Sequence, residues 1–152
     1  MRVAVVLTTA FFMACTSAAV QEDELVTKDV IQVPGSLEGL PFSSAVRAGD
    51  MLFLSGQIGT LPGTRDLAPG GVAAETRQAL ENIKAVLEYA GSSMDRVVKC
   101  TVFLLDIDDY AAVNEVYASY FMEDPPARSA MAATGLALGS QVEIECIALA
   151  GR

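Results

Sequence analysis

Two glutamates near the end of the chain have the spacing of a pair that shares one face of a strand. Glu143 and Glu145 lie two residues apart within residues 141–149, a stretch that predicts a β-strand. Their neighbours are apolar, and a carboxylate among apolar groups has a raised pKa unless a cation pairs with it, which suits a base that activates water. The alternative, which a glutamate pair in isolation favours, is two solvated acids at a sheet edge.

One arginine follows a conformationally restricted segment of the backbone. Arg128 follows Pro125-Pro126-Ala127, and the prolines limit where its guanidinium can point. A guanidinium is a planar fork that matches a carboxylate, so Arg128 is a candidate anchor for a substrate carboxylate. The alternative is an ion pair with a neighbouring Asp or Glu, which the residues alone slightly favour.

Three further positions could line a site. Ser55 and Gly56 lie at the end of a predicted strand, where a glycine lets the backbone approach a ligand closely. Asn114 lies early in a predicted helix. From the residues alone, the better interpretations are structural: a strand end that turns a corner, and a surface or inter-subunit hydrogen bond.

The composition argues against several classes of function. The chain has no histidine, the commonest general base and metal ligand, and we find no carboxylate cluster with metal-ligand spacing. The glycines of residues 63–71 lack the Lys-Ser/Thr of a phosphate loop. A formal net charge of -9 opposes binding to nucleic acid or to an anionic membrane. We therefore expect neither a metal site nor a nucleic-acid partner.

The first nineteen residues predict a leader. Arg2 precedes an apolar run over residues 3–13 and small residues over 14–19, the layout of a secretory signal peptide that is too short to span a membrane. Two processing routes stay open, peptidase cleavage near residues 17–19 or lipidation of Cys15. Residues 20–28 are then a spacer and residues 29–152 one domain, in a protein that is exported, periplasmic or lipid-anchored.

The rest of the sequence predicts elements in the order β-β-β-α-β-α-β-β. The strands are expected over residues 26–33, 42–47, 51–55, 97–105, 129–133 and 141–149, and the helices over 73–90 and 110–121. A turn at Ala48-Gly49-Asp50 predicts a hairpin. This order favours one mixed six-stranded sheet with both helices on one face. The buried sides of the helices are predicted to hold Ala79, Ile83, Val86, Leu87 and Ala90, and Tyr110, Val113, Val116, Tyr117 and Tyr120.

Both faces of the predicted sheet are apolar. Ile147 and Leu149 fall on the opposite side of their strand from Cys146 and Ala148. One face packs on the helices, and a second subunit would cover the other. Cys100 and Cys146 have apolar neighbours and predict buried, inert thiols; the alternative is a disulfide, which needs adjacent strands in register.

Five blocks of the sequence together resemble the RidA/YjgF family. They are AVRAGDMLFLSGQIG (45–59), TRQALENIKAVLEYAG (76–91), VVKCTVFLLDIDDYAAVNEVYASYF (97–121), PPARSA (125–130) and VEIECIAL (142–149). The resemblance runs from about residue 29 to the C-terminus. It implies the chorismate-mutase-like α+β fold and a homotrimer with a central barrel and clefts between subunits.

The resemblance also implies an activity. It is that of a 2-iminobutanoate/2-iminopropanoate deaminase-like hydrolase, which converts reactive enamines and imines such as 2-aminoacrylate to 2-keto acids and ammonia without a cofactor. Arg128 would pair with the substrate carboxylate and Glu143 would position water. Ser55 and Gly56 would line the cleft, and Asn114 would help to shape it.

Two cleft positions depart from the family pattern. Phe42 stands where the family usually has a tyrosine, and Ala130 stands where it often has a cysteine. These changes slightly favour two rival hypotheses, a trimer that binds a small carboxylate without turnover and an inert structural trimer. The presence of Arg128 and Glu143 favours the enzyme.

Overall fold

The computed structural model describes residues 27–36 and 39–151. The predicted leader over residues 1–19, with Cys15, and residues 20–26 of the predicted spacer lie outside the described residues. Among the helices of the described part, none is both long enough and apolar enough to cross a membrane.

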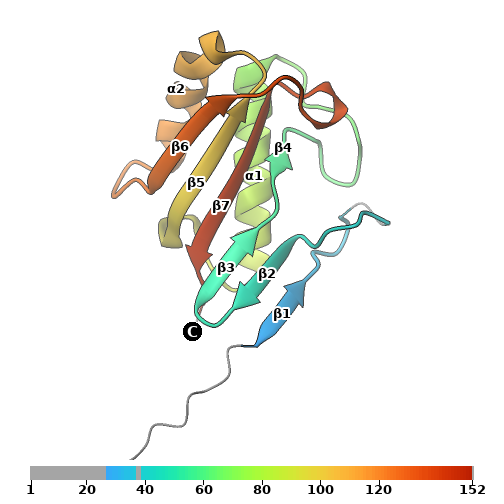
Figure 1. Cartoon of the computed structure of the whole chain (residues 1–152), viewed down its shortest axis with the longest axis vertical. Helices are drawn as coiled ribbons and strands as arrows, with labels where there is room; N and C mark the ends of the chain where they lie inside the picture. Colours follow the sequence, from blue (N-terminus) through green and yellow to red (C-terminus); the bar gives the residue numbers. More distant parts are fainter. Residues whose placement is uncertain (1–26, 37–38, 152) are drawn as a thin grey trace, which may run out of the picture.

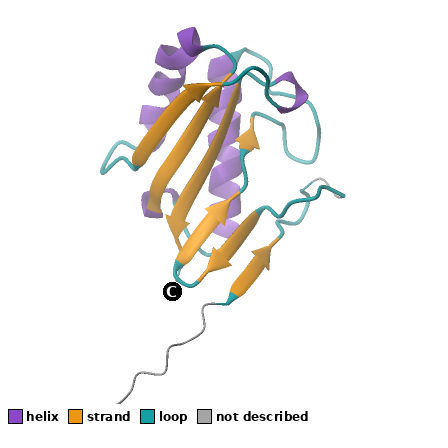
Figure 2. Cartoon of the chain, viewed as in Figure 1, coloured by secondary structure: helices purple, strands orange, loops and turns teal. Residues whose placement is uncertain are grey.

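The chain forms a single mixed sheet with two helices behind it (Figures 1 and 2). The order along the sheet is β1-β2-β3-β7-β5-β6, and the short strand β4 pairs with β7. Only β5 and β6 run parallel among the paired strands of the described residues. The expected α+β architecture is confirmed. The elements are β1 (Lys28–Ile31), β2 (Ala45–Ala48), β3 (Met51–Leu54), β4 (Gln57–Ile58), α1 (Val72–Tyr89), β5 (Val97–Leu104), α2 (Tyr110–Tyr120), β6 (Ala127–Ala132) and β7 (Val142–Leu149).

The bounds of the predicted strands differ from the observed ones by up to three residues, and two differences lie near the candidate site. The second strand begins at Ala45 and not at residue 42, because Ser44 makes hydrogen bonds that do not belong to the strand ladder. Its amide donates to the Gln32 side chain, and its hydroxyl accepts from the Val33 amide. Strand β4 was not expected. It lies just beyond Gly56, and its two residues pair with Ile144 and Glu143 of β7.

The core lies between the sheet and α1. Alternate residues of β5 and β7 are buried on the helix side, as are the predicted apolar residues of α1. The other side of the sheet carries exposed or half-buried residues in the single chain, and it is apolar only in part. This open face includes Phe53, Phe103, Met131, Ile147 and Leu149, but also Lys99, Thr101, Glu143 and Glu145.

The buried side of α2 is confirmed only in part. Val113, Val116 and Tyr117 are buried, whereas Tyr110, predicted to be buried, is 41% exposed. The prediction for Tyr110 is wrong because this residue is the first of α2 and its hydroxyl turns toward Arg128 on β6.

The prediction of free thiols is also wrong. Cys100 of β5 and Cys146 of β7 are directly opposite each other, their Cα atoms are 4.1 Å apart, and their side chains form a disulfide. Both residues are buried on the helix side of the sheet. The register between these strands, which the sequence does not contain, decides between thiols and a disulfide.

Candidate active site

Arg128 is held by three residues of one helix. Its Nη2 donates hydrogen bonds to Asn114 Oδ1 at 2.6 Å and to the Tyr110 hydroxyl oxygen at 3.0 Å. Its guanidinium carbon lies 4.7 Å from the centre of the Tyr117 ring and 5.4 Å from that of Tyr110, within cation–π range. Arg128 and Asn114, which were predicted separately as site residues, are thus in contact.

The partners of Arg128 in the described part of the chain are all neutral. Burial raises the pKa of Tyr117 to about 12, although the charge of Arg128 acts in the opposite direction, so this tyrosine stays protonated. The ion pair that the sequence left open as an alternative is not found among these contacts. A half-buried cation without a counter-ion favours the binding of an anion.

Glu143 lies against Gly56. A methyl group added to Gly56 would overlap the Glu143 carboxylate, so only a glycine fits at this end of β3. Burial raises the pKa of Glu143, and the charge of Glu145 on the same face raises it further. Gly56 and Glu143, two further predicted site residues, therefore also lie together, and the carboxylate is of the kind that can accept a proton from water.

Of the remaining predicted residues, Ser55 adjoins Gly56 and Ala130 lies near Arg128. The Ser55 hydroxyl donates to the Ser43 carbonyl at 2.7 Å, which places the segment after Phe42 beside Gly56. Phe42 itself is 54% exposed. Ala130 follows Arg128 two residues later on the same side of β6 and packs against the core. Phe42 lines a separate hollow with residues 32–36, 39 and 40. We call Ser55, Gly56 and Glu143 the glutamate group, and Arg128, Asn114, Ala130, Tyr110 and Tyr117 the arginine group.

The two groups lie on opposite faces of the sheet. Arg128 is level with Cys100 on β5, and its side chain contacts α2 on the helix side. Glu143 is level with Phe103 and points to the open side. Two strand spacings and three residues separate their positions, which makes the Cα separation roughly 14 Å. One small ligand therefore cannot touch both residues within one chain.

A buried glutamate helps to position the strand that carries Glu143. Glu75, in the first turn of α1, accepts a hydrogen bond from the Gln141 amide at 2.8 Å, immediately before β7 begins. Its backbone also lies so close to Gly59 that a side chain there would collide with it. Glu75 thus links α1 to the ends of both β4 and β7.

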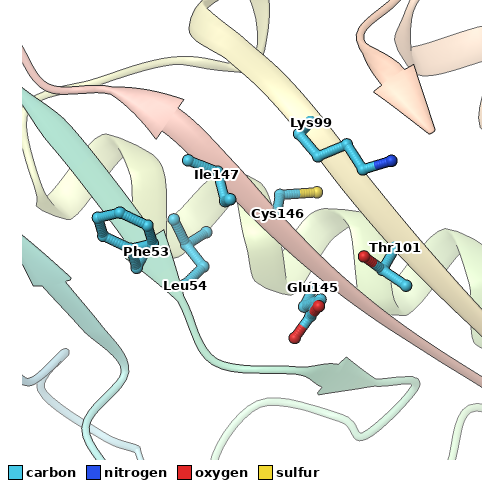
Figure 3. A pocket seen from close by; sticks show the side chains of 7 residues that line it. All are labelled: Phe53, Leu54, Lys99, Thr101, Glu145, Cys146 and Ile147. Atoms are coloured by element: carbon cyan, nitrogen blue, oxygen red, sulfur yellow. The ribbon is translucent and has the colours of Figure 1, made fainter. Parts of the chain in front are cut away.

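The open face has a small pocket of its own. It is lined by residues of β3, β5 and β7, and none of the seven predicted site residues belongs to it (Figure 3). Lys99 at its edge donates to the Ser129 hydroxyl at 2.7 Å.

Within residues 27–36 and 39–151, no group of three His, Cys, Asp or Glu side chains could hold a metal ion.

Sequence reasoning missed Tyr110 and Tyr117 as site residues. With Asn114 they occupy positions i, i+4 and i+7 of α2, which lie on one side of a helix. That spacing was interpreted as packing against the core, which is correct for Tyr117. A polar residue at the centre of the stripe is the signal that could have indicated a contact with Arg128.

Comparison with known proteins identifies relatives over most of the chain. The family described as endoribonuclease L-PSP matches residues 36–150. A RutC family protein from Pyrococcus horikoshii is 49% identical over 108 residues, which cover 71% of this chain and 86% of that protein. The 2-iminobutanoate/2-iminopropanoate deaminase of Mus musculus is 45% identical over 111 residues, which cover 73% of this chain and 82% of that enzyme.

A solved structure shares the fold. The crystal structure of E. coli TdcF with bound serine has a TM-score of 0.73 and 36% sequence identity to this chain. The match covers 80% of this chain and 98% of that one.

Proposed function

The chain belongs to the RidA/YjgF family, and on this premise we propose that it hydrolyses reactive 2-imino and enamine acids to 2-keto acids and ammonia. The observation that carries the proposal is the Arg128 guanidinium, a half-buried cation whose partners in the described residues are neutral. A substrate carboxylate would supply the missing negative charge. Serine, bound in the structure of a relative, carries such a carboxylate.

The reaction needs little beyond binding and one base. An enamine first takes a proton on carbon and becomes the imine, whose C=N carbon is already electrophilic. Water adds to this carbon while Glu143 accepts one of its protons, and the nitrogen gains a proton from solvent, which gives an amino alcohol. The hydroxyl group then loses its proton to solvent and the amino group takes up the proton held by Glu143, so the C–N bond breaks, ammonia leaves and the C=O bond of the keto acid forms. Holding the substrate and one water in place supplies the rate enhancement.

We place the active site between two copies of the chain. The arginine group and the glutamate group lie on opposite faces of the sheet, so one chain offers each half only once and on separate surfaces. The exposed apolar side chains of the open face, among them Phe53, Met131 and Leu149, support assembly with further copies. In a trimer, Arg128 of one chain and Glu143 of the next would complete each site, which accords with the homotrimer implied by the resemblance.

The experiment that tests the function is imine hydrolysis in solution. An amino-acid oxidase generates the imine in situ, and ammonia release or loss of the imine is followed with the wild type and with Arg128→Ala. We expect the wild type to accelerate imine decay and Arg128→Ala to lower kcat/KM roughly 100-fold, because the substrate loses its counter-ion. Equal rates for the two proteins would contradict the role of Arg128.

A second function is favoured by one observation. The arginine group forms completely within one chain, whereas Glu143 does not reach it, and this suits a module that binds a small carboxylate without turnover. The variant Glu143→Gln separates the two functions. For an enzyme we expect kcat to fall roughly 100-fold while the ligand affinity is kept, whereas a binding module shows no turnover in either protein.

We do not propose RNA as a substrate, since the formal net charge of -9 repels phosphates.

Export remains a proposal from residues 1–19 alone. We propose that this leader directs the chain out of the cytoplasm, with Cys15 as the lipidation site on one of the two processing routes. Cell fractionation of the full chain and of Cys15→Ser tests both steps. An exported wild type found with membranes and a variant released from them would support the lipid anchor, and a cytoplasmic wild type would contradict export.

A further inference from the structure

We infer that the hydroxyl of Tyr110 binds the substrate directly, as a second donor to the carboxylate beside Arg128. This inference rests on the proposed function and adds a residue to its binding site.

The hydrogen bonds of Arg128 leave no two neighbouring nitrogen donors free to bind both oxygens of a carboxylate. A guanidinium has five N–H donors, and the two on Nη2 are taken by Asn114 and Tyr110. Nη1 and Nε have no hydrogen-bond partner within the described residues. A carboxylate that binds a guanidinium through two parallel bonds generally needs Nη2 as one of the donors. Here that contact would displace Asn114 or Tyr110, so a second donor has to come from another group.

Tyr110 offers such a donor. Its oxygen accepts from Nη2 of Arg128 at 3.0 Å, and in the described part of the chain its own O–H has no acceptor. Acceptance from a cation makes the hydroxyl a better donor, because the two bonds polarise each other. The side chain is 41% exposed, so a ligand can reach the hydroxyl from solvent.

The surroundings fix this hydroxyl beside the guanidinium. Tyr110 begins α2, Asn114 follows one turn later, and Tyr117 lies beneath the guanidinium one turn beyond. The three side chains thus hold the guanidinium between them from one helix. A ligand carboxylate would meet Nη1 of Arg128 with one oxygen and the Tyr110 O–H with the other. The pair of donors selects a ligand with two acceptor oxygens, which a neutral amide does not have.

The test compares Tyr110→Phe with the wild type. Imine turnover is measured as above, and binding of 2-oxobutanoate, the keto acid product of a four-carbon imine, is measured by calorimetry. Loss of a hydrogen bond to a charged group should raise KM and the Kd of 2-oxobutanoate about tenfold. We expect kcat to stay unchanged, because the contact is made equally before and during the reaction.

A matched control removes a tyrosine hydroxyl from the same helix. The Tyr120 hydroxyl donates to Glu81 at 2.6 Å and not to the site. Tyr120→Phe should therefore keep the KM and Kd of the wild type. A wild-type KM and Kd in Tyr110→Phe would overturn the role of Tyr110 while leaving the proposed function intact. A wild type that neither hydrolyses imines nor binds 2-oxobutanoate would overturn both.

Discussion

Glu143 is the residue whose environment makes a pH dependence predictable. Burial and the neighbouring charge of Glu145 raise its pKa above the ordinary glutamate value of 4.5. A base acts in its ionised form, so activity should fall on acidification at a pH higher than an ordinary glutamate would give. The half-buried carboxylate is thus suited to hold the water proton that the reaction releases.

The variant Glu145→Gln tests this pH dependence. It removes the second cause of the raised pKa and leaves burial, the larger one, in place. The acid limb of the profile of kcat/KM against pH should move to lower pH, with little change on the plateau. A limb at the wild-type position would show that Glu145 does not act on the base. The charge of Lys99, whose amine donates a hydrogen bond to Ser129, is the same in both proteins and does not affect the comparison.

At the residue scale, residues that the sequence singled out separately turn out to be neighbours, whereas their environments were not predicted. Arg128 with Asn114, and Gly56 with Glu143, are both in contact. The neutral shell of Arg128 was not predictable, because an arginine near several acids can pair with any of them until the fold is known. Tyr110 was missed because its helical spacing is the same for a core residue and for one that turns toward a ligand.

At the element scale, the disulfide gives a prediction for stability. It joins β5 and β7 across 46 residues of sequence, and closing a loop of that size lowers the entropy of the unfolded chain. The double variant Cys100→Ala and Cys146→Ala should lose about 2–4 kcal/mol of unfolding free energy, as measured by chemical denaturation. A reductant should weaken the wild type and leave the variant unchanged. Equal stability of the two proteins under oxidising conditions would contradict a bonded pair.

The long elements could be predicted and the short ones could not. α1 and β5 carry many apolar residues at regular spacing, so their bounds in the structure lie within one residue of those expected. β4 has two residues and no period to detect. The start of β2 depends on hydrogen bonds of Ser44 with Gln32 and Val33, which lie 12 and 11 residues earlier in the chain. Strand boundaries that are set by tertiary contacts cannot be predicted from local sequence patterns.

At the scale of the whole molecule, the sequence predicted two apolar faces and the structure shows which face stays open. The division of the candidate site between these faces was not predictable, because it depends on the strand order β7-β5-β6 and on the register of each pair. That division is the physical reason to place the active site between copies of the chain. A single copy would then hold ligand weakly and turn over nothing.

The most direct test is complementation between two inactive variants. Arg128→Ala and Glu143→Gln are unfolded together, mixed in equal amounts, refolded and assayed for imine hydrolysis, beside each variant refolded alone. If Arg128 and Glu143 of neighbouring copies form each site, one half times one half of the sites, about one quarter, regain both residues. We predict about a quarter of the wild-type rate for the mixture and almost none for either variant alone. A mixture as inactive as its parts, with assembly confirmed by light scattering, would contradict a site shared between copies.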